Sequence, residues 1–107
     1  MKIEFQKMTI DQPPEKDESP GEISATSDQF SNVVLNAEAA LRGWELRFSD
    51  SDHEFHQGFV RITNVEVVED RKVRVTVTIG LRDDSGNWDD KYEGKAEILI
   101  IAEVADN

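Results

Sequence analysis

The stretch that decides the fold is VRVTVTIGL, residues 73–81, in which valine, isoleucine and leucine occupy every second position. The positions between them carry arginine, threonine and glycine, so one side of the segment is apolar and the other is polar. Alternation with a period of two is typical of a β-strand with one face in a core and the other in water. We therefore predict a half-buried strand here, preceded by a turn at residues 69–72.

Two further segments alternate in the same way but change phase once. Residues 32–49 shift phase at Arg42-Gly43, and residues 58–68 shift phase at Thr63-Asn64. A β-bulge, which adds one residue to a strand, produces such a change, and glycine suits the backbone of a bulge. Residues 36–42 also contain good helix formers, so a short helix is the alternative there.

The two ends of the chain are less regular. Residues 95–104, KAEILIIAEV, are apolar at even and odd positions alike, which indicates a central strand, a sandwich corner or a subunit contact. Residues 2–10 form a predicted short strand whose phase changes near Gln6-Lys7, as a bulge or two half-strands would require. Residues 11–24 hold three prolines, one glycine, five acids and one apolar side chain, which predicts a solvated, flexible linker.

Many strands, short turns and little helix predict an all-β fold. We expect an antiparallel β-sandwich of jelly-roll or lectin-like type, with an N-terminal strand on a flexible, acidic, proline-rich arm. The expected organisation is a strand at residues 1–10, a linker at 11–24 and a sandwich domain at 25–107. A strand on such an arm can pair with an edge of its own domain or with a neighbour's.

The composition excludes several classes of function. The 107 residues include 23 acidic and 12 basic side chains, a formal net charge of −11. This charge argues against a nucleic-acid backbone or an anionic membrane as partner. The chain has no cysteine, which excludes disulfides, thiolate metal sites and cysteine nucleophiles. It shows no signal-peptide pattern and no run of 18 apolar residues, so a cytoplasmic or particle-associated location is the default expectation.

The negative charge is concentrated in three segments. Residues 11–22, 50–57 and 82–94 account for ten of the eleven net negative charges. If the strands between them alternate in direction, the second and third segments are loops at the same end of the sandwich. Both histidines of the chain, His53 and His56, belong to this end.

Carboxylates clustered at this end are candidates for binding a cation, which would relieve their mutual repulsion. Oxygen-rich loops suit Ca²⁺, and the candidate ligands are Asp50, Asp52, Asp83 and Asp84. His53 and His56, with the first two of these acids, could instead hold a transition metal if a turn brings the imidazoles together. The competing interpretation is a solvated acidic rim whose Asp and Asn side chains cap their own turns.

The same end carries the side chains of a carbohydrate site. Aromatic rings stack on the C–H face of a sugar, while carboxylates, amides and imidazoles bind its hydroxyl groups. The candidate ligand-binding residues are His53, Asn87, Trp88, Asp89, Asp90 and Tyr92. The alternative is that Trp88 and Tyr92 fold inward and cap the sandwich. We expect Trp44, inside a strand, to pack in the core or at the bulge.

Catalysis and nucleic-acid mimicry fit the sequence less well. Paired carboxylates or Asp–His pairs serve hydrolysis, but a small domain with shallow loops offers little cleft. The chain has no G-x-S-x-G, P-loop or H-E-x-x-H motif. Mimicry of nucleic acid would place acids in rows along a face rather than on loops. Because the loops offer little cleft and the catalytic motifs are missing, we expect no enzymatic activity.

Residues 40–102 carry a family resemblance. They contain ALRGW at 40–44, Asp52-His53 after a strand, LRDDSGNWDDKYEG at 81–94 and ILIIA at 98–102. This pattern is similar to that of small bacterial or phage-associated β-sandwich proteins and, more distantly, of H-type lectin-like domains. The resemblance implies a short antiparallel sandwich that assembles through edge strands and binds sugars.

The expected function is carbohydrate binding by a lectin-like module through its two acidic loops, with or without Ca²⁺. The alternative is a structural or assembly component of an oligomer or larger particle, in which residues 2–10 and 95–104 add to a neighbour's sheet. A carbohydrate or a basic protein surface is the expected partner, and a homo-oligomer is the expected state. We expect neither nucleic acid nor membrane as a partner.

Overall fold

The computed structural model describes residues 1–16, 21–48, 55–83 and 91–106. Its six strands are β1 (Lys2–Lys16), β2 (Gly21–Thr26), β3 (Val34–Phe48), β4 (Phe55–Val68), β5 (Lys72–Asp83) and β6 (Lys91–Val104). These ranges contain no helix, which confirms the prediction of an all-β fold. No segment of the described chain is therefore a helix long and apolar enough to cross a membrane.

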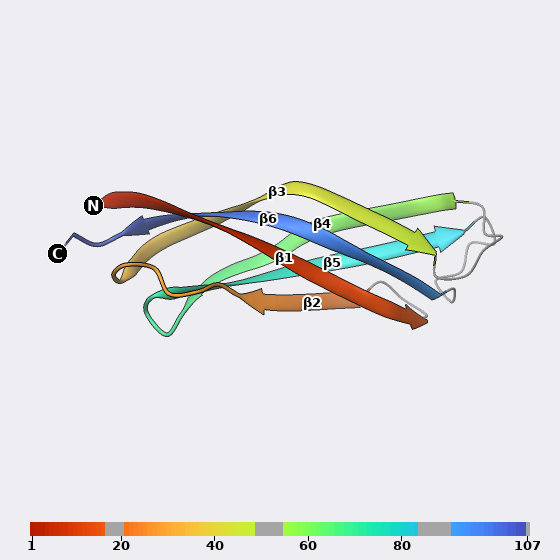
Figure 1. Ribbon diagram of the computed structural model, residues 1–107, viewed down its shortest axis with the longest axis horizontal. Helices are drawn as coiled ribbons and strands as arrows, with labels where there is room; N and C mark the ends of the chain where they lie inside the picture. Colours follow the sequence, from red (N-terminus) through yellow and green to blue (C-terminus); the bar gives the residue numbers. More distant parts are fainter. Residues whose placement is uncertain (17–20, 49–54, 84–90, 107) are drawn as a thin grey trace.

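The strands form two three-stranded antiparallel sheets (Figure 1). Sheet A has the order β1-β6-β3 and sheet B the order β2-β5-β4, so β6 and β5 are the central strands. The two sheets lie against each other in a sandwich-like body of 55 × 20 × 17 Å. β6 as the central strand of sheet A confirms one of the three interpretations of residues 95–104. It also means that this strand has no free edge to offer to a neighbour's sheet.

The core lies between the two central strands. Val73, Val75, Val77 and Ile79 of β5 are fully buried, as the alternation in residues 73–81 predicts. On β6 the buried positions are Ala96, Ile98, Ile100, Ala102 and Val104. Each buried valine or isoleucine side chain contributes roughly 1.5–3 kcal/mol. These two strands therefore supply most of the apolar surface that holds the sheets together.

Both predicted bulges on the later strands are present. The pairing register shifts between Leu41 and Gly43 on β3 and between Ile62 and Asn64 on β4. Residues 36–42 are part of β3, so the helical alternative is wrong. Trp44 pairs with the buried Ala96 but is 55% exposed, so its predicted place in the core is also wrong. The indole stays exposed because β3 is an edge strand with no neighbour beyond it in sheet A.

The bulge predicted near Gln6-Lys7 is absent. β1 pairs with β6 in one unbroken register from Lys2↔Val104 to Gln12↔Gly94. The apolar residues change parity because the first half of the strand is apolar on the outer face of sheet A and the second half is apolar on the inner face. Ile3 and Phe5 lie on the outer face of sheet A, whereas Met8 and Ile10 lie against the core.

Strands also occupy most of the segment that we expected to be a flexible linker. β1 continues to Lys16, and β2 begins at Gly21 and pairs with β5. An edge strand can lose the N–H group of one of two consecutive prolines, here Pro13 and Pro14, on its free side, whereas the other proline removes an N–H group on the side of β6. The register shift between Gln12 and Glu15 marks the place of the two prolines. The expectation of a solvated arm is thus corrected for residues 11–16 and 21–24.

Candidate functional site

The strand ends that flank the two later acidic loops meet at one end of the molecule. β3 and β5 end there, and β4 and β6 begin there, at the right of Figure 1. The pairs Phe48↔Tyr92 and Phe55↔Asp83 are the last rungs of the two ladders. The alternation of strand direction from which we derived a common end for these loops is therefore confirmed.

The residues predicted to bind ligands at this end lie mostly outside the described residues. Those wholly outside are Asp50, Asp52, His53, Asp84, Asn87, Trp88, Asp89 and Asp90. Asp83 and Tyr92 are placed by their backbones, on β5 and β6, and their side chains are not described. Within the described ranges no three His, Cys, Asp or Glu side chains gather as metal ligands would. The predicted carbohydrate and Ca²⁺ sites, and the question of whether His53 and His56 meet, thus stay predictions.

The described residues offer a different candidate, on the outer face of sheet A. The register aligns Ile3 with Glu103, Phe5 with Ile101 and Lys7 with Leu99. Phe5 is 62% exposed and Ile3 is 48% exposed, while Leu99 and Ile101 are half-buried beside them. We call Ile3, Phe5, Leu99 and Ile101 the outer apolar patch. The sequence shows Leu99 and Ile101 on this face, but only the register shows that Ile3 and Phe5 adjoin them.

The outer apolar patch reaches the edge of its sheet, because β1 is an edge strand. Within the described chain the edge strands are β1 and β3 in sheet A and β2 and β4 in sheet B. Edge strands expose a row of backbone N–H and C=O groups that can pair with another chain. The patch and the β1 edge therefore form one continuous surface.

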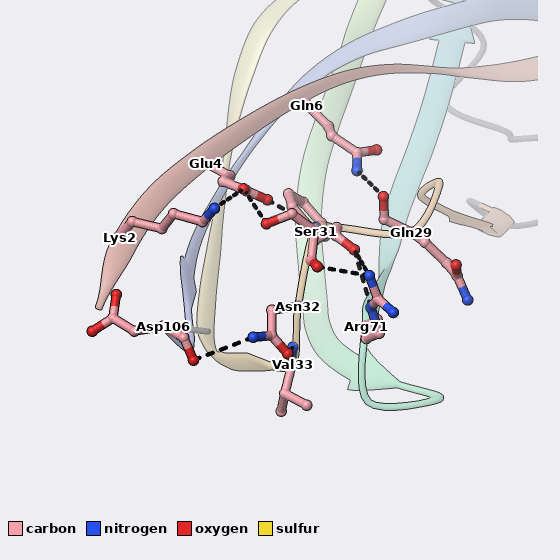
Figure 2. Close-up of polar contacts among 10 residues, drawn as sticks. Lys2, Glu4, Gln6, Gln29, Ser31, Asn32, Val33, Arg71 and Asp106 are labelled. Carbon is pink, nitrogen blue, oxygen red and sulfur yellow. Dashed lines mark hydrogen bonds and ion pairs between the residues drawn. The ribbon is translucent and has the colours of Figure 1, made fainter.

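At the end of the molecule away from the acidic loops, side chains of β1 hold the connector formed by residues 27–33 (Figure 2). The Glu4 carboxylate accepts hydrogen bonds from the Ser31 amide, at 3.0 Å, and from the Ser31 hydroxyl. Gln6 Nε2 donates to the Asp28 carbonyl at 3.1 Å, and Gln6 Oε1 accepts from the Asp28 amide at 3.2 Å. The Ser31 hydroxyl, then the Ser31 amide, and the charge of Lys2 lower the pKa of Glu4 below its ordinary value.

Arg71, in the turn between β4 and β5, also holds this connector by hydrogen bonds. Arg71 Nη2 donates to the carbonyl oxygens of Phe30, at 3.0 Å, and Ser31, at 2.7 Å. The Phe30 amide donates in return to the Arg71 carbonyl at 2.7 Å. Figure 2 shows Ser31 bound by both Glu4 and Arg71. The sequence did not predict the contacts of Glu4, Ser31 and Arg71, because these residues follow no periodic pattern and are far apart in the chain.

An open hollow of about 420 Å³ lies between β3 and β4, on the opposite side of the molecule from β1. Its lining residues are Ala37, Glu38, Ala39, Ile62, Thr63, Asn64 and Val65. The Thr63 hydroxyl already donates to the Thr76 carbonyl at 3.3 Å. Glu38 is the single ionisable residue of the lining, so the hollow lacks the paired groups that acid–base chemistry needs.

Comparison of the chain with protein-family models, with curated proteins and with solved structures found no match. The resemblance to phage-associated β-sandwich proteins and H-type lectin-like domains therefore stays a prediction. What classifies the chain is its architecture, an all-β fold of two three-stranded antiparallel sheets.

Proposed function

We propose that this chain is a non-enzymatic structural module that self-associates through sheet A. The observation that carries the proposal is the exposure of Ile3 and Phe5 next to Leu99 and Ile101. Single exposed apolar side chains are ordinary, whereas apolar side chains that adjoin one another mark interaction surfaces. Fully burying one phenylalanine or isoleucine contributes roughly 1.5–3 kcal/mol, so covering this patch favours association.

The experiment is a mass measurement by light scattering over a range of protein concentrations. We expect the natural sequence to form an oligomer and Phe5→Ser to shift it to the monomer. Leu35→Ser is the matched control, because Leu35 is 58% exposed in the same sheet but lies at a bulge of the opposite edge strand. Circular dichroism would show that each variant keeps its strands. A natural chain that is monomeric at every concentration would contradict the proposal.

Carbohydrate binding at the acidic-loop end is the second candidate function. It is supported by the meeting of the four strand ends that flank residues 49–54 and 84–90. In this candidate His53, Asn87, Trp88, Asp89, Asp90 and Tyr92 contact the sugar. Asp50, Asp52, Asp83 and Asp84 bind Ca²⁺, and the sandwich is of the jelly-roll or lectin-like type. A basic protein surface is the other partner that this negatively charged end would attract.

A melting series tests the second candidate. Binding to the folded state raises the melting temperature, so a recognised glycan should do so, with Ca²⁺ adding to the effect if the carboxylates bind it. Trp88→Ala should abolish the shift. Trp44→Ala is the matched control, because Trp44 is the other tryptophan of the chain and lies on β3. If neither a glycan panel, Ca²⁺ nor chelator moves the melting temperature, this candidate is wrong.

A further inference from the structure

We infer that the partner in this self-association is β1 of a second copy, paired antiparallel along the free edges of the two β1 strands. The two sheets A then form one six-stranded sheet with the order β3-β6-β1-β1-β6-β3. The inference rests on the proposed function and gives it a partner and a geometry.

The first argument is the regularity of the β1 edge. Natural edge strands avoid pairing with other chains by being short, by bulges, by proline or by inward charges. β2 has six residues, β3 carries two register shifts and β4 also carries two. β1 is regular over the eleven residues from Lys2 to Gln12, and its prolines come only after that stretch. Among the described strands, β1 thus presents the longest edge without a bulge or a proline.

The second argument is the distribution of charge on the outer face of sheet A. On β3 and β6 this face carries the acids Glu38, Glu45, Glu93, Glu97 and Glu103 against the bases Arg47 and Lys95, so acids predominate. On β1 the outward positions from Ile3 to Asp11 carry one base, Lys7, and one acid, Asp11, whose charges balance. Two copies of a chain with a net charge of −11 therefore meet with least repulsion along β1.

The same charges disfavour the other way of covering the patch, which is to stack two sheets A face to face. Stacked sheets are about 10 Å apart, so the carboxylates of β6 would face those of the partner. Edge pairing separates the two β6 strands by three strand spacings, about 14 Å. That distance exceeds the screening length of about 8 Å at physiological ionic strength.

The third argument is that edge pairing joins the two outer apolar patches. In an antiparallel pair whose faces match, the numbers of opposed residues have a constant, even sum, so odd-numbered residues face odd-numbered ones. When that sum is 8 or 10, Ile3 and Phe5 of both copies lie side by side on one face, and the paired stretch runs from Lys2 to Gln6 or to Met8. Each copy covers apolar flanks that are exposed in the single chain.

The fourth argument is that β1 is already held in strand conformation. The side chains of Glu4 and Gln6, which bind residues 28–31, leave β1 from its inner face. Its free edge and its outward side chains are left for a partner. A strand fixed in this way loses little conformational freedom when it pairs, which favours association.

Cysteine cross-linking tests the geometry, because the chain has no cysteine and each introduced thiol is then the only one. Single variants Ile3→Cys, Phe5→Cys, Lys7→Cys and Thr9→Cys would be mixed in all pairs and oxidised mildly. Opposed residues of antiparallel strands have Cα atoms about 4.5–5.5 Å apart, within the disulfide range of about 4.4–6.8 Å. We expect disulfide dimers only from pairs whose residue numbers share one sum, and that sum is 8 or 10, because only these values join the two outer apolar patches.

Leu99→Cys on β6 is the control that separates edge pairing from stacking. Edge pairing predicts no disulfide dimer from this variant, since the two β6 strands are about 14 Å apart. A natural chain that is dimeric, but whose disulfides form through Leu99→Cys or without a constant sum on β1, would overturn the inference and leave the proposed function standing. A natural chain that is monomeric in the scattering measurement would overturn both.

Discussion

The amide of Val73, a residue with no exposed surface, donates its hydrogen bond to the hydroxyl oxygen of Ser27 at 2.9 Å. The Ser27 amide donates to the Val73 carbonyl at 2.8 Å, one rung beyond the last β2–β5 pair, Thr26↔Arg74. The hydroxyl takes the place of the backbone carbonyl that would continue the ladder. The chain can therefore leave sheet B towards β3 while the buried N–H group of Val73 keeps a hydrogen-bond acceptor.

The hydrogen bond from the Val73 amide to the Ser27 hydroxyl predicts that Ser27→Ala destabilises the fold. A buried donor left without a partner costs about 1–3 kcal/mol, and we expect a loss of free energy of unfolding in that range. Urea unfolding followed by circular dichroism measures it. Ser24→Ala is the control, because the Ser24 hydroxyl is exposed and bonds only another hydroxyl, that of Thr76. Equal stabilities of the two variants would contradict the role of Ser27.

The close approach of β3 to β6 at Gly94 predicts a second effect. A Cβ at Gly94 would lie 2.3 Å from the Glu45 carbonyl oxygen and 2.5 Å from Leu46 Cδ2. Gly94→Ala must therefore push the two strands apart, and we expect a loss of about 1–3 kcal/mol. At Gly43 the nearest atom is the end of a flexible side chain, Glu97 Oε2 at 3.1 Å, so Gly43→Ala should be close to neutral. Chemical denaturation of the pair would refute this view of Gly94 if both alanines cost the same.

The hydrogen bonds from Ser31 to Glu4 predict a dependence of stability on pH. Because the pKa of Glu4 is lowered in the folded state, its contribution is complete above the ordinary pKa of about 4.3 and is lost as the pH falls through the folded value. We expect Glu4→Gln to lower the melting temperature at neutral pH and to equal the natural chain in acid.

Ser31→Ala should reproduce part of this behaviour, since the Ser31 hydroxyl is the largest cause of the lowered pKa of Glu4. The measurement is a set of thermal melts from neutral to acidic pH for the three chains. A constant difference between Glu4→Gln and the natural chain at every pH would show that Glu4 acts through packing rather than charge.

The turn between β4 and β5 predicts that glycine is more stable than alanine at position 69. Glu69 and Asp70 have positive φ angles, of 50° and 60°. This conformation costs an L-residue about 1–2 kcal/mol, and glycine avoids that cost. We expect Glu69→Gly to unfold at higher denaturant concentration than Glu69→Ala, by about 1 kcal/mol in free energy of unfolding. Both variants lose the 3.3 Å ion pair with Lys72, so their comparison isolates the backbone. A more stable alanine variant would contradict the prediction.

The parts of the fold that follow from the sequence are those with a local period. The alternation of residues 73–81 identifies the central strand of sheet B, and the phase changes at Arg42-Gly43 and Thr63-Asn64 locate bulges because a bulge inverts the pattern after it. The change near Gln6-Lys7 looks the same in the sequence but has another cause. Ile3 faces outward there because of its register with Glu103, a residue one hundred positions away.

The sequence signals failed where tertiary context decided the outcome. Pro13 and Pro14 indicate a loop, yet they are accommodated where β1 is an edge strand. The polar contacts of Glu4, Ser31 and Arg71 join residues with no common motif, so no pattern could have predicted them. For the acidic loops, the direction of the strands was predictable and is confirmed, whereas the chemistry of His53, Trp88 and their neighbours lies outside the described residues.

The first residues of β1 and the loop-bearing strand ends lie at opposite ends of a body 55 Å long (Figure 1). In the dimer that we propose, a two-fold axis through the first part of β1 points the two acidic-loop ends in opposite directions. Linked binding sites gain avidity only when both can engage at once. With its loop ends pointing in opposite directions, such a dimer would link two separate surfaces that carry the ligand. It would not bind one surface twice.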